Sequence, residues 1–204
     1  MAWLDILVLN LIIYTMADLD GAFNKIERKN FLPSYEVSNA HFDVPIPIGF
    51  GQTNSQPSTV YLMLEWLEPD LGDKVLDVGS GSGWTTALLA CLVGNKGSVF
   101  GVERIKELVE FGRENCKRLD IRNAKFYLAG NEFGLKKYAP YDRILVSASY
   151  DEIPKSLIYQ LKIGGKMVIP VNNDILEITK LSDNSLDIIT HPGFVFVPLI
   201  RGVD

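Results

Sequence analysis

The chain has 204 residues, with 20 Lys and Arg against 25 Asp and Glu, and a formal net charge of −5 at pH 7. This length suits one α/β domain with a sizeable core, and the acidic balance argues against a large nucleic-acid footprint, which normally needs a basic face. Cys91 and Cys116 lack C-x-x-C spacing and there are only two histidines, so the composition predicts reduced thiols of a cytoplasmic protein and no metal site.

The N-terminal stretch, residues 2–17, is strongly apolar. It lacks the basic start and the cleavage site of a signal peptide. Asp5 and Asn10 interrupt it, and it is shorter than the roughly 20 apolar residues that a membrane span needs. We interpret it as a helix packed on the domain, and the alternative is an extension upstream of a start at Met16.

Residues 17–29 are predicted to form a helix, because Leu19, Ala22, Phe23 and Ile26 recur at helical spacing. The small basic cluster of Lys25, Arg28 and Lys29 is interpreted as the solvated end of this helix. Residues 30–56 contain several prolines and glycines and are predicted to be irregular, and residues 58–67 to form the next helix.

The most informative stretch is 73–84, Asp-Lys-Val-Leu-Asp-Val-Gly-Ser-Gly-Ser-Gly-Trp. Residues 74–78 read as a buried strand and 84–93 as a helix, with Gly79, Gly81 and Gly83 between them. This order is typical of a nucleotide-binding βαβ unit, in which a ligand lies against glycine backbone. Glu103 follows Gly83 by 20 residues at the end of a second apolar run. An acidic residue at this position can accept hydrogen bonds from both hydroxyls of a ribose.

The glycine spacing indicates the class of cofactor. The turn reads G-x-G-x-G rather than the dinucleotide pattern G-x-G-x-x-G, and no Gly-Lys-Ser/Thr closes it as in a P-loop. The pattern resembles motif I of the class I S-adenosyl-L-methionine (SAM) methyltransferases. That resemblance implies that Asp77, the three glycines and Glu103 bind SAM, whereas a glycine turn without a ligand is the alternative. Asp77 stands at the strand end, where it can order the turn through backbone N–H groups or reach a cationic ligand.

The remaining elements alternate between strands at 98–103, 124–128, 141–147 and 165–171 and helices at 104–118 and 154–162. This alternation predicts a parallel, doubly wound sheet. Two further strands, 175–181 and 186–197, flank an Asp183-Asn184-Ser185 turn. The sequence therefore predicts a Rossmann-like α/β fold, with a mostly parallel seven-stranded sheet closed by a C-terminal antiparallel hairpin. Residues 1–56 are expected to be a helical segment and ligand loop of the same domain as the core at 57–204.

A second motif narrows the family. Residues 45–57 read Pro-Ile-Pro-Ile-Gly-Phe-Gly-Gln-Thr-Asn-Ser-Gln-Pro, which closely resembles the signature ahead of motif I in protein-L-isoaspartate O-methyltransferases, P-[LI]-x-I-G-[YF]-x-x-T-[IL]-S-x-P. Four other segments are similar to the same family: residues 26–33, 139–148, 153–171 and 196–199.

The resemblance implies methylation of the α-carboxylate of L-isoaspartyl residues in damaged proteins, with SAM as cofactor and S-adenosyl-L-homocysteine as product. It places Ser55 at the catalytic serine, in a hydrogen-bonding rather than a nucleophilic role. It places Gln52, Thr53 and Asn54 in a loop over the cofactor, and Gly130 and Asn131 at the adenine. The composition and charge further predict a cytoplasmic protein without nucleic-acid or membrane partners, and a monomer, because no exposed helical stripe other than residues 2–16 calls for a partner.

The chain departs from the family pattern at three places. Asn54 replaces Ile or Leu, Ser58 stands where relatives often carry His or Tyr, and Asn131 replaces an Asp. These departures leave open a SAM-binding module whose active site has decayed. The other alternative is another class I methyltransferase built on a similar domain, such as a tRNA adenine methyltransferase.

Overall fold

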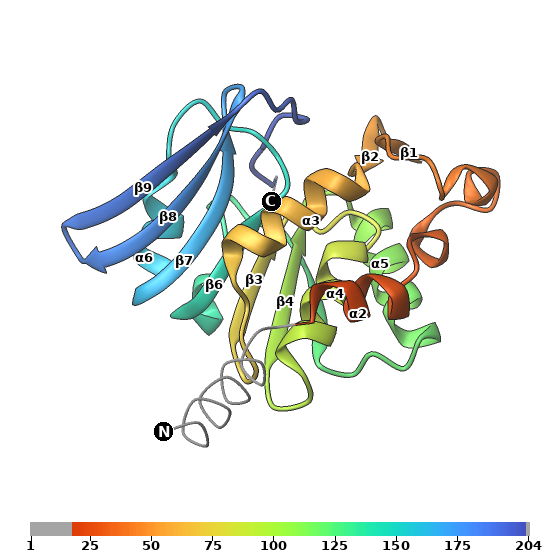
Figure 1. Ribbon diagram of the computed structural model, residues 1–204, viewed down its shortest axis with the longest axis horizontal. Coiled ribbons are helices and arrows are strands. Elements are labelled where there is room, and N and C mark those ends of the chain that lie inside the picture. The colour runs from red at the N-terminus through yellow and green to blue at the C-terminus, as the bar shows by residue number, and fades with distance from the viewer. Residues whose placement is uncertain (1–17, 203–204) are drawn as a thin grey trace, which may run out of the picture.

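The computed structural model describes residues 18–202 and is built around one seven-stranded sheet (Figure 1). The strand order is β5-β4-β3-β6-β7-β8-β9, with β3 to β7 parallel and β8 and β9 antiparallel. The predicted α/β fold and its C-terminal hairpin are confirmed. The strands are β3 (Lys74–Val78), β4 (Ser98–Glu103), β5 (Ala124–Leu128), β6 (Tyr141–Val146), β7 (Leu161–Val171), β8 (Asp174–Ser182) and β9 (Ser185–Pro192).

Helices cover both faces of this sheet. One face packs against α2 (Leu19–Lys25), α3 (Pro57–Leu67), α4 (Trp84–Val93) and α5 (Lys106–Arg118), and the other against α6 (Lys155–Gln160). Successive strand residues point to opposite faces, so Val75 joins the first core cluster and Leu76 the second. A 3-10 turn, η3 (Lys136–Tyr138), precedes β6.

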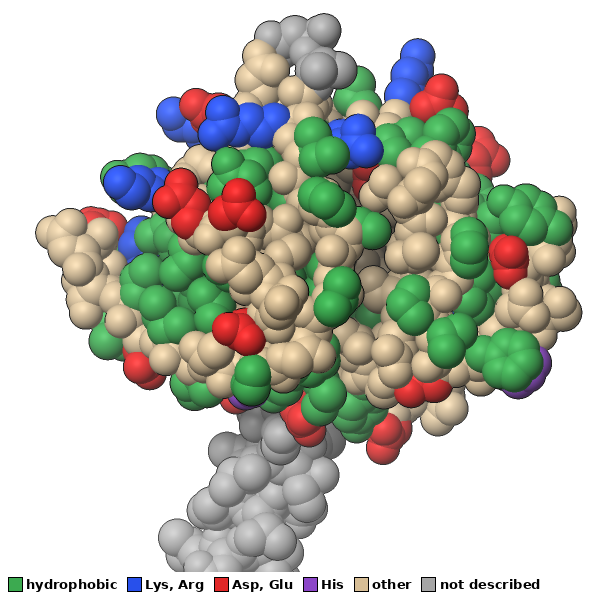
Figure 2. Space-filling view, turned by 90° about the horizontal axis from the view of Figure 1, so that it is seen from above, with side chains coloured by type: hydrophobic (Ala, Val, Ile, Leu, Met, Phe, Trp, Pro, Cys, Tyr) green, Lys and Arg blue, Asp and Glu red, His purple; other side chains and the backbone are tan. Residues whose placement is uncertain are grey.

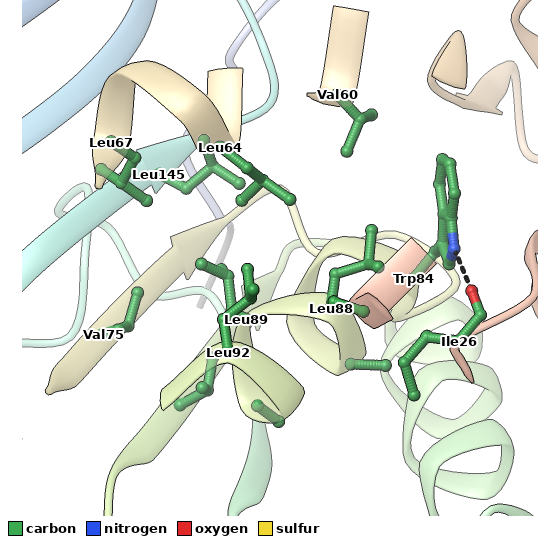
Figure 3. Close-up of a cluster of buried hydrophobic side chains, with 14 of the residues drawn as sticks. Ile26, Val60, Leu64, Leu67, Val75, Trp84, Leu88, Leu89, Leu92 and Leu145 are labelled. Carbon is green, nitrogen blue, oxygen red and sulfur yellow. Dashed lines mark hydrogen bonds between the residues drawn. The ribbon is translucent and has the colours of Figure 1, made fainter. Parts of the chain in front are cut away.

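Helix α4 is the centre of the first core. Nine of its ten residues are buried, as expected for a helix that is apolar all round. Its side chains lie among those of α3 and the strands, and the Trp84 Nε1 donates to the Ile26 carbonyl at 3.0 Å (Figure 3). This bond fixes the segment that follows α2 to the helix that follows the glycine turn.

The segment before α3 differs from the prediction. Helix α2 ends at Lys25, and two 3-10 turns follow, η1 (Arg28–Phe31) and η2 (Val37–Asn39). The stretch predicted to be irregular also holds an antiparallel hairpin of β1 (Ile46–Gly49) and β2 (Gln52–Asn54). Gly49, Phe50 and Gly51 all have positive φ, and this tight turn reverses the chain.

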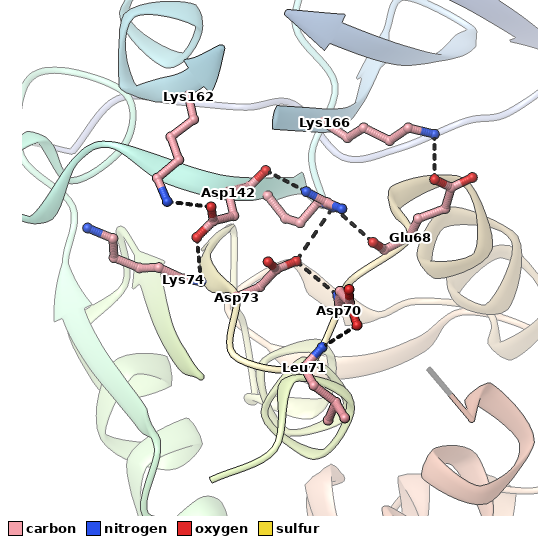
Figure 4. A network of polar contacts seen from close by, with 9 residues as sticks. Glu68, Asp70, Leu71, Asp73, Lys74, Asp142, Lys162 and Lys166 are labelled. Atoms are coloured by element: carbon pink, nitrogen blue, oxygen red, sulfur yellow. Dashed lines mark hydrogen bonds and ion pairs between the residues drawn. The ribbon is translucent and has the colours of Figure 1, made fainter. Parts of the chain in front are cut away.

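A polar network joins the amino-terminal ends of the strands, away from the glycine turn (Figure 4). Asp142 accepts a hydrogen bond from the Lys74 N–H at 2.9 Å and pairs with Lys162. Arg143 donates through Nε to the Glu68 carbonyl at 2.9 Å and lies 3.7 Å from Asp73. These contacts hold β3, β6 and β7 together and give Asp142 a structural role.

Two further predictions concern the apolar N-terminal stretch and the two cysteine thiols. Within residues 18–202, no helix has the length and apolar character required to cross a bilayer, and the apolar stretch 2–17 lies outside the described residues. Cys91 and Cys116 lie in α4 and α5 and are free thiols. Burial raises the pKa of Cys116 to about 12, which keeps this thiol protonated and unreactive.

Candidate active site

The candidate site lies over the carboxyl ends of β3 and β4, where ligands bind in open parallel sheets. Viewed from above, this face is hollowed near its middle, with hydrophobic side chains on either side (Figure 2). The glycine turn after β3 is pinned to β4, because the N–H groups of Gly79 and Ser80 donate to the Val102 carbonyl at 2.8 and 3.1 Å. The turn and the end of β4 therefore form one rigid wall.

Glu103 ends β4 and bonds directly to the turn. Its carboxylate accepts from the Gly81 N–H at 3.1 Å through one oxygen and from the Ile105 N–H at 2.9 Å through the other. A carboxylate offers about four acceptor positions, so two remain for ligand hydroxyls. The residue is only 7 % exposed but lines two cavities beside the turn.

Asp77 lies beneath the turn. It is fully buried, and its Oδ2 accepts hydrogen bonds from the Thr85 and Thr86 hydroxyls at 2.8 and 2.6 Å. Burial raises its pKa to about 6. The residue is not among those lining the cavities. It orders the turn by anchoring the first residues of α4, through side-chain hydroxyls and not through backbone N–H groups.

The glycines of the turn have different tasks. Gly79 and Gly81 line the cavity, and Gly83 does not. Gly83 has a φ of +89°, and a Cβ there would stand 3.0 Å from both the Gly112 Cα and the Phe126 Cζ. Its lack of a side chain lets α4 pack closely against α5 and β5.

Two narrow inner cavities adjoin the turn, and they share Gln52, Gly79, Glu103 and Ala148 in their walls. The first is about 40 Å³ and also includes Gly130 and Phe133. The second is about 50 Å³ and also includes Thr53, Asn54 and Ser55. Asn131 lies exposed beside Gly130 and is not among the lining residues.

A larger outer groove of about 630 Å³ lies beyond the hairpin. Four residues line both this groove and the second cavity: Thr53, Ser55, Ser147 and Val197. Ser55 therefore stands at the boundary between the glycine turn and the outer groove. Every residue lining the outer groove is uncharged: Pro45, Thr53, Ser55, Gln56, Ser58, Thr59, Leu62, Ser147, Gly193, Phe194, Val195, Phe196 and Val197.

The interpretation of Arg28 as part of a solvated helix end is wrong. Its side chain is 6 % exposed and lies 5.5 Å from the Trp84 ring centre. The guanidinium donates to the carbonyl oxygens of residues 42, 44, 54 and 55 and to the Asn54 Oδ1. Sequence spacing gave no sign of this, because every acceptor lies 14 or more residues away.

Other residues that line the cavities were not predicted from the sequence. The C-terminal residues Pro198, Leu199, Ile200 and Gly202 line the first cavity, and the Gly202 N–H donates to the Gly130 carbonyl at 3.1 Å. Strand β9, predicted to reach residue 197, ends at Pro192. The next two N–H groups, of Gly193 and Phe194, donate to the Asn173 carbonyl, which turns residues 193–197 toward the outer groove.

Comparison with known proteins identifies the family of the chain. Residues 7–204 match the model of the protein-L-isoaspartate(D-aspartate) O-methyltransferase family. Two curated relatives are named protein-L-isoaspartate O-methyltransferase. The one from Fervidobacterium nodosum is 44% identical over 179 residues, which is 85% of this chain and 90% of that protein. The one from Pyrococcus horikoshii is 44% identical over 187 residues, 89% of this chain and 84% of that protein.

Solved structures extend the likeness to three dimensions. A putative protein-L-isoaspartate O-methyltransferase from Plasmodium falciparum, solved in complex with S-adenosyl-L-homocysteine, has a TM-score of 0.78 at 30% identity and covers 91% of both chains. Another solved protein-L-isoaspartate O-methyltransferase has a TM-score of 0.81 at 32% identity, with 88% of this chain spanning 60% of that one. The chain therefore belongs to the protein-L-isoaspartate(D-aspartate) O-methyltransferase family.

Proposed function

We propose that this protein transfers a methyl group from SAM to the α-carboxylate of L-isoaspartyl residues in damaged proteins and peptides. The observation that carries the proposal is the position of Ser55, between the cavity beside the glycine turn and the outer groove. Membership of the family supports the reaction and the cofactor. The backbone amide nitrogen of the following residue would then attack the methyl ester, with loss of methanol, to form a succinimide, and hydrolysis of this ring would give partly normal aspartate.

The residues of the inner cavities fit SAM, which supplies a methyl group on a positively charged sulfonium. Glu103 would hold the ribose hydroxyls with its two remaining acceptor positions. The backbone at Gly79 and Gly81 admits a ligand at close approach. Gln52, Thr53 and Asn54 would cover the cofactor from the hairpin side, and Gly130 and Asn131 would lie at the adenine. Asp77 and Gly83 would support the site from beneath the turn.

The acceptor needs little activation. An α-carboxyl has a pKa of about 3.5 and is ionised at neutral pH, so no strong general base is required. The Ser55 hydroxyl would donate a hydrogen bond to one carboxylate oxygen and leave the other free to attack the methyl carbon in line. The uncharged walls of the outer groove leave the carboxylate without an ion pair that would weaken it as a nucleophile. Catalysis then rests on positioning and electrostatics.

The direct test offers the protein radiolabelled methyl-SAM and two matched peptides, one with L-isoaspartate and one with L-aspartate. Base-labile label on the isoaspartyl peptide alone is the expected result. No label on either peptide, with SAM binding measured separately by calorimetry, would contradict the proposal. Label on tRNA instead would favour another class I methyltransferase, and SAM binding without turnover on any substrate would favour a decayed site.

We further propose a monomer of one domain that acts in the cytoplasm on polypeptides, without nucleic-acid or membrane partners. The net charge of −5 and the free thiols of Cys91 and Cys116 support this. Residues of α2 and η1 share the core cluster of α4, which supports one folding unit. Light scattering of the full chain at micromolar concentration should give the mass of one chain, and a dimer mass would contradict the proposal.

A further inference from the structure

Arg28 is the central hydrogen-bond donor of the loop that carries Ser55. Its Nε donates to the Asn54 Oδ1 at 2.8 Å and one terminal nitrogen donates to the Phe42 carbonyl at 2.9 Å. The other terminal nitrogen donates to the carbonyls of Val44, Asn54 and Ser55 at 2.7, 2.9 and 2.9 Å. One buried fork therefore joins both ends of the β1–β2 hairpin, and its last acceptor belongs to Ser55 itself.

Asn54 connects this fork to the glycine turn. Its side chain accepts from Arg28 through the oxygen and donates from Nδ2 to the Ser82 hydroxyl at 3.2 Å. Ser82 is held in turn by Asn115 of α5, which donates from Nδ2 to the Ser82 carbonyl at 3.0 Å. Family members usually have Ile or Leu at the position of Asn54, and neither can make these two bonds. The departure from the family pattern is thus a polar link in this chain.

The guanidinium also carries a positive charge. Within residues 18–202, Arg28 makes no ion pair shorter than 4 Å. Burial lowers its pKa to about 10, partly offset by Asp43, so it remains charged at neutral pH. The charged guanidinium donates its hydrogen bonds mainly to backbone carbonyl oxygens. Such charge-assisted hydrogen bonds are stronger than hydrogen bonds between neutral groups.

We propose that Arg28 and Asn54 are positioning residues for methyl transfer, linking Ser55 to the glycine turn through the chain Arg28–Asn54–Ser82. This inference rests on the proposed function only for its kinetic consequence. Neither side chain would touch the acceptor carboxylate. Arg28 would fix the backbone of Ser55, and Asn54 would set the distance of that backbone from the cofactor side.

The test compares Arg28→Lys with Arg143→Lys. Lys cannot reproduce the planar five-donor fork, and Arg143 is a matched control because it also donates to backbone carbonyls, at the opposite end of the sheet. Arg28→Lys should lower kcat for an isoaspartyl peptide at least tenfold, and by more than it weakens S-adenosyl-L-homocysteine binding. Arg143→Lys should lose thermal stability and keep kcat within twofold. For both variants, kcat is calculated per site that binds S-adenosyl-L-homocysteine. Equal kcat values for Arg28→Lys and Arg143→Lys would overturn the inference.

Hydrogen exchange provides a readout that does not depend on turnover. In Arg28→Lys, amides of residues 42–56 should exchange at least tenfold faster than in the wild type, whereas those of β3 and β4 should not change. Arg143→Lys should leave residues 42–56 protected. If the wild type methylates no isoaspartyl peptide, the proposed function fails, and the exchange data still decide the positioning role. Unchanged exchange across 42–56 in Arg28→Lys would overturn it.

Asn54→Leu is the second variant, chosen because the family pattern itself carries Leu there. It removes the two side-chain bonds of Asn54 and leaves the four backbone acceptors of Arg28 in place. We expect faster exchange at residues 52–56 and a threefold to tenfold lower kcat. In the double variant, the loss of kcat should be smaller than the two single losses combined, because both substitutions break the Arg28–Asn54 hydrogen bond. Wild-type kcat and exchange in Asn54→Leu would overturn the role of Asn54.

Discussion

The carboxylate of Glu103 accepts a hydrogen bond from the backbone N–H of Gly81 at 3.1 Å. The acid that ends β4 is therefore bonded to the turn that follows β3, before any ligand is considered. Glu103 therefore helps to hold the turn in place and, in the proposed function, also offers hydrogen-bond acceptors to the ribose of SAM. Substitutions at this position should affect binding and local order together.

Glu103→Ala should weaken SAM binding at least tenfold, because hydrogen bonds to a charged group contribute about 1.5–3 kcal/mol each. It should also destabilise the fold slightly, since the N–H groups of Gly81 and Ile105 lose their acceptor. Calorimetry with S-adenosyl-L-homocysteine and thermal unfolding measure the two effects. Glu103→Gln keeps one acceptor oxygen, so its ligand affinity and thermal stability should lie between those of the wild type and Glu103→Ala. Unfolding of Glu103→Ala at room temperature would instead make Glu103 chiefly structural.

Ser55→Ala should lower turnover far more than SAM affinity. Ser55 lines both the second cavity and the outer groove, so loss of its hydroxyl would remove the proposed donor to the acceptor carboxylate and leave Glu103 and the glycine turn intact. Steady-state kinetics with an isoaspartyl peptide, together with calorimetric binding of S-adenosyl-L-homocysteine, separate these terms. An equal loss of turnover and affinity would show that Ser55 mainly shapes the cofactor loop.

Asp77→Asn should change the pH dependence of stability. Burial raises the pKa of Asp77 to about 6 from the ordinary 3.8, so at intermediate pH the folded state retains a proton that the unfolded state has lost. The free energy of unfolding of the wild type therefore falls as pH rises from about 4 to about 6, by roughly 3 kcal/mol for this group. Asn has no such titration, so its advantage over the wild type should grow across that window.

Urea unfolding of both proteins at pH 4, 5, 6 and 7 measures the effect of Asp77→Asn. Asn can still accept from the Thr85 and Thr86 hydroxyls through its carbonyl oxygen, which keeps the local packing comparable. Parallel pH curves for the two proteins would mean that Asp77 does not titrate in this range.

Asp43→Ala should disturb the acceptor side of the site and not the cofactor side. Asp43 accepts from the Ser58 N–H at 2.9 Å and from the Gln56 side chain at 3.1 Å, and so caps α3 from outside the helix. Loss of such a cap costs about 1 kcal/mol. Gln56 and Ser58 line the outer groove, so KM for the peptide should rise while affinity for S-adenosyl-L-homocysteine stays within twofold. A change confined to cofactor affinity would contradict this assignment.

The same contact should be sensitive to acid. The hydrogen bond from the Ser58 N–H, followed by that from Gln56, lowers the pKa of Asp43 below 3.8. Its contribution to stability is therefore present above that pH and is lost as pH falls through the lower folded-state value. Asp43→Asn cannot titrate, so its unfolding curves should lack this acid-induced loss relative to the wild type.

Local sequence pattern was sufficient to predict the sheet and most of the residues that line the candidate site. Val75 and Leu76 could be placed in a buried strand from their apolar run, and Gly79, Gly81 and Glu103 follow from spacing along the chain. Ser55 was found through the motif in residues 45–57, which is also contiguous. In each case the signal lies within one element or at a fixed distance from it, and periodicity and turn chemistry report such signals directly.

The sequence by itself determined the α/β fold, the glycine turn, Glu103 at the end of β4 and the loop that carries Ser55. Only the tertiary structure decided that Arg28 is buried at the centre of that loop, that Asp77 anchors α4 and that Asp43 caps α3. Arg28 reaches Ser55 across 27 residues and Asp43 reaches Ser58 across 15, and most of these acceptors and donors are backbone groups. Every residue has a backbone carbonyl and nearly every one an N–H, so no residue type or spacing marks the one that a distant side chain will bind.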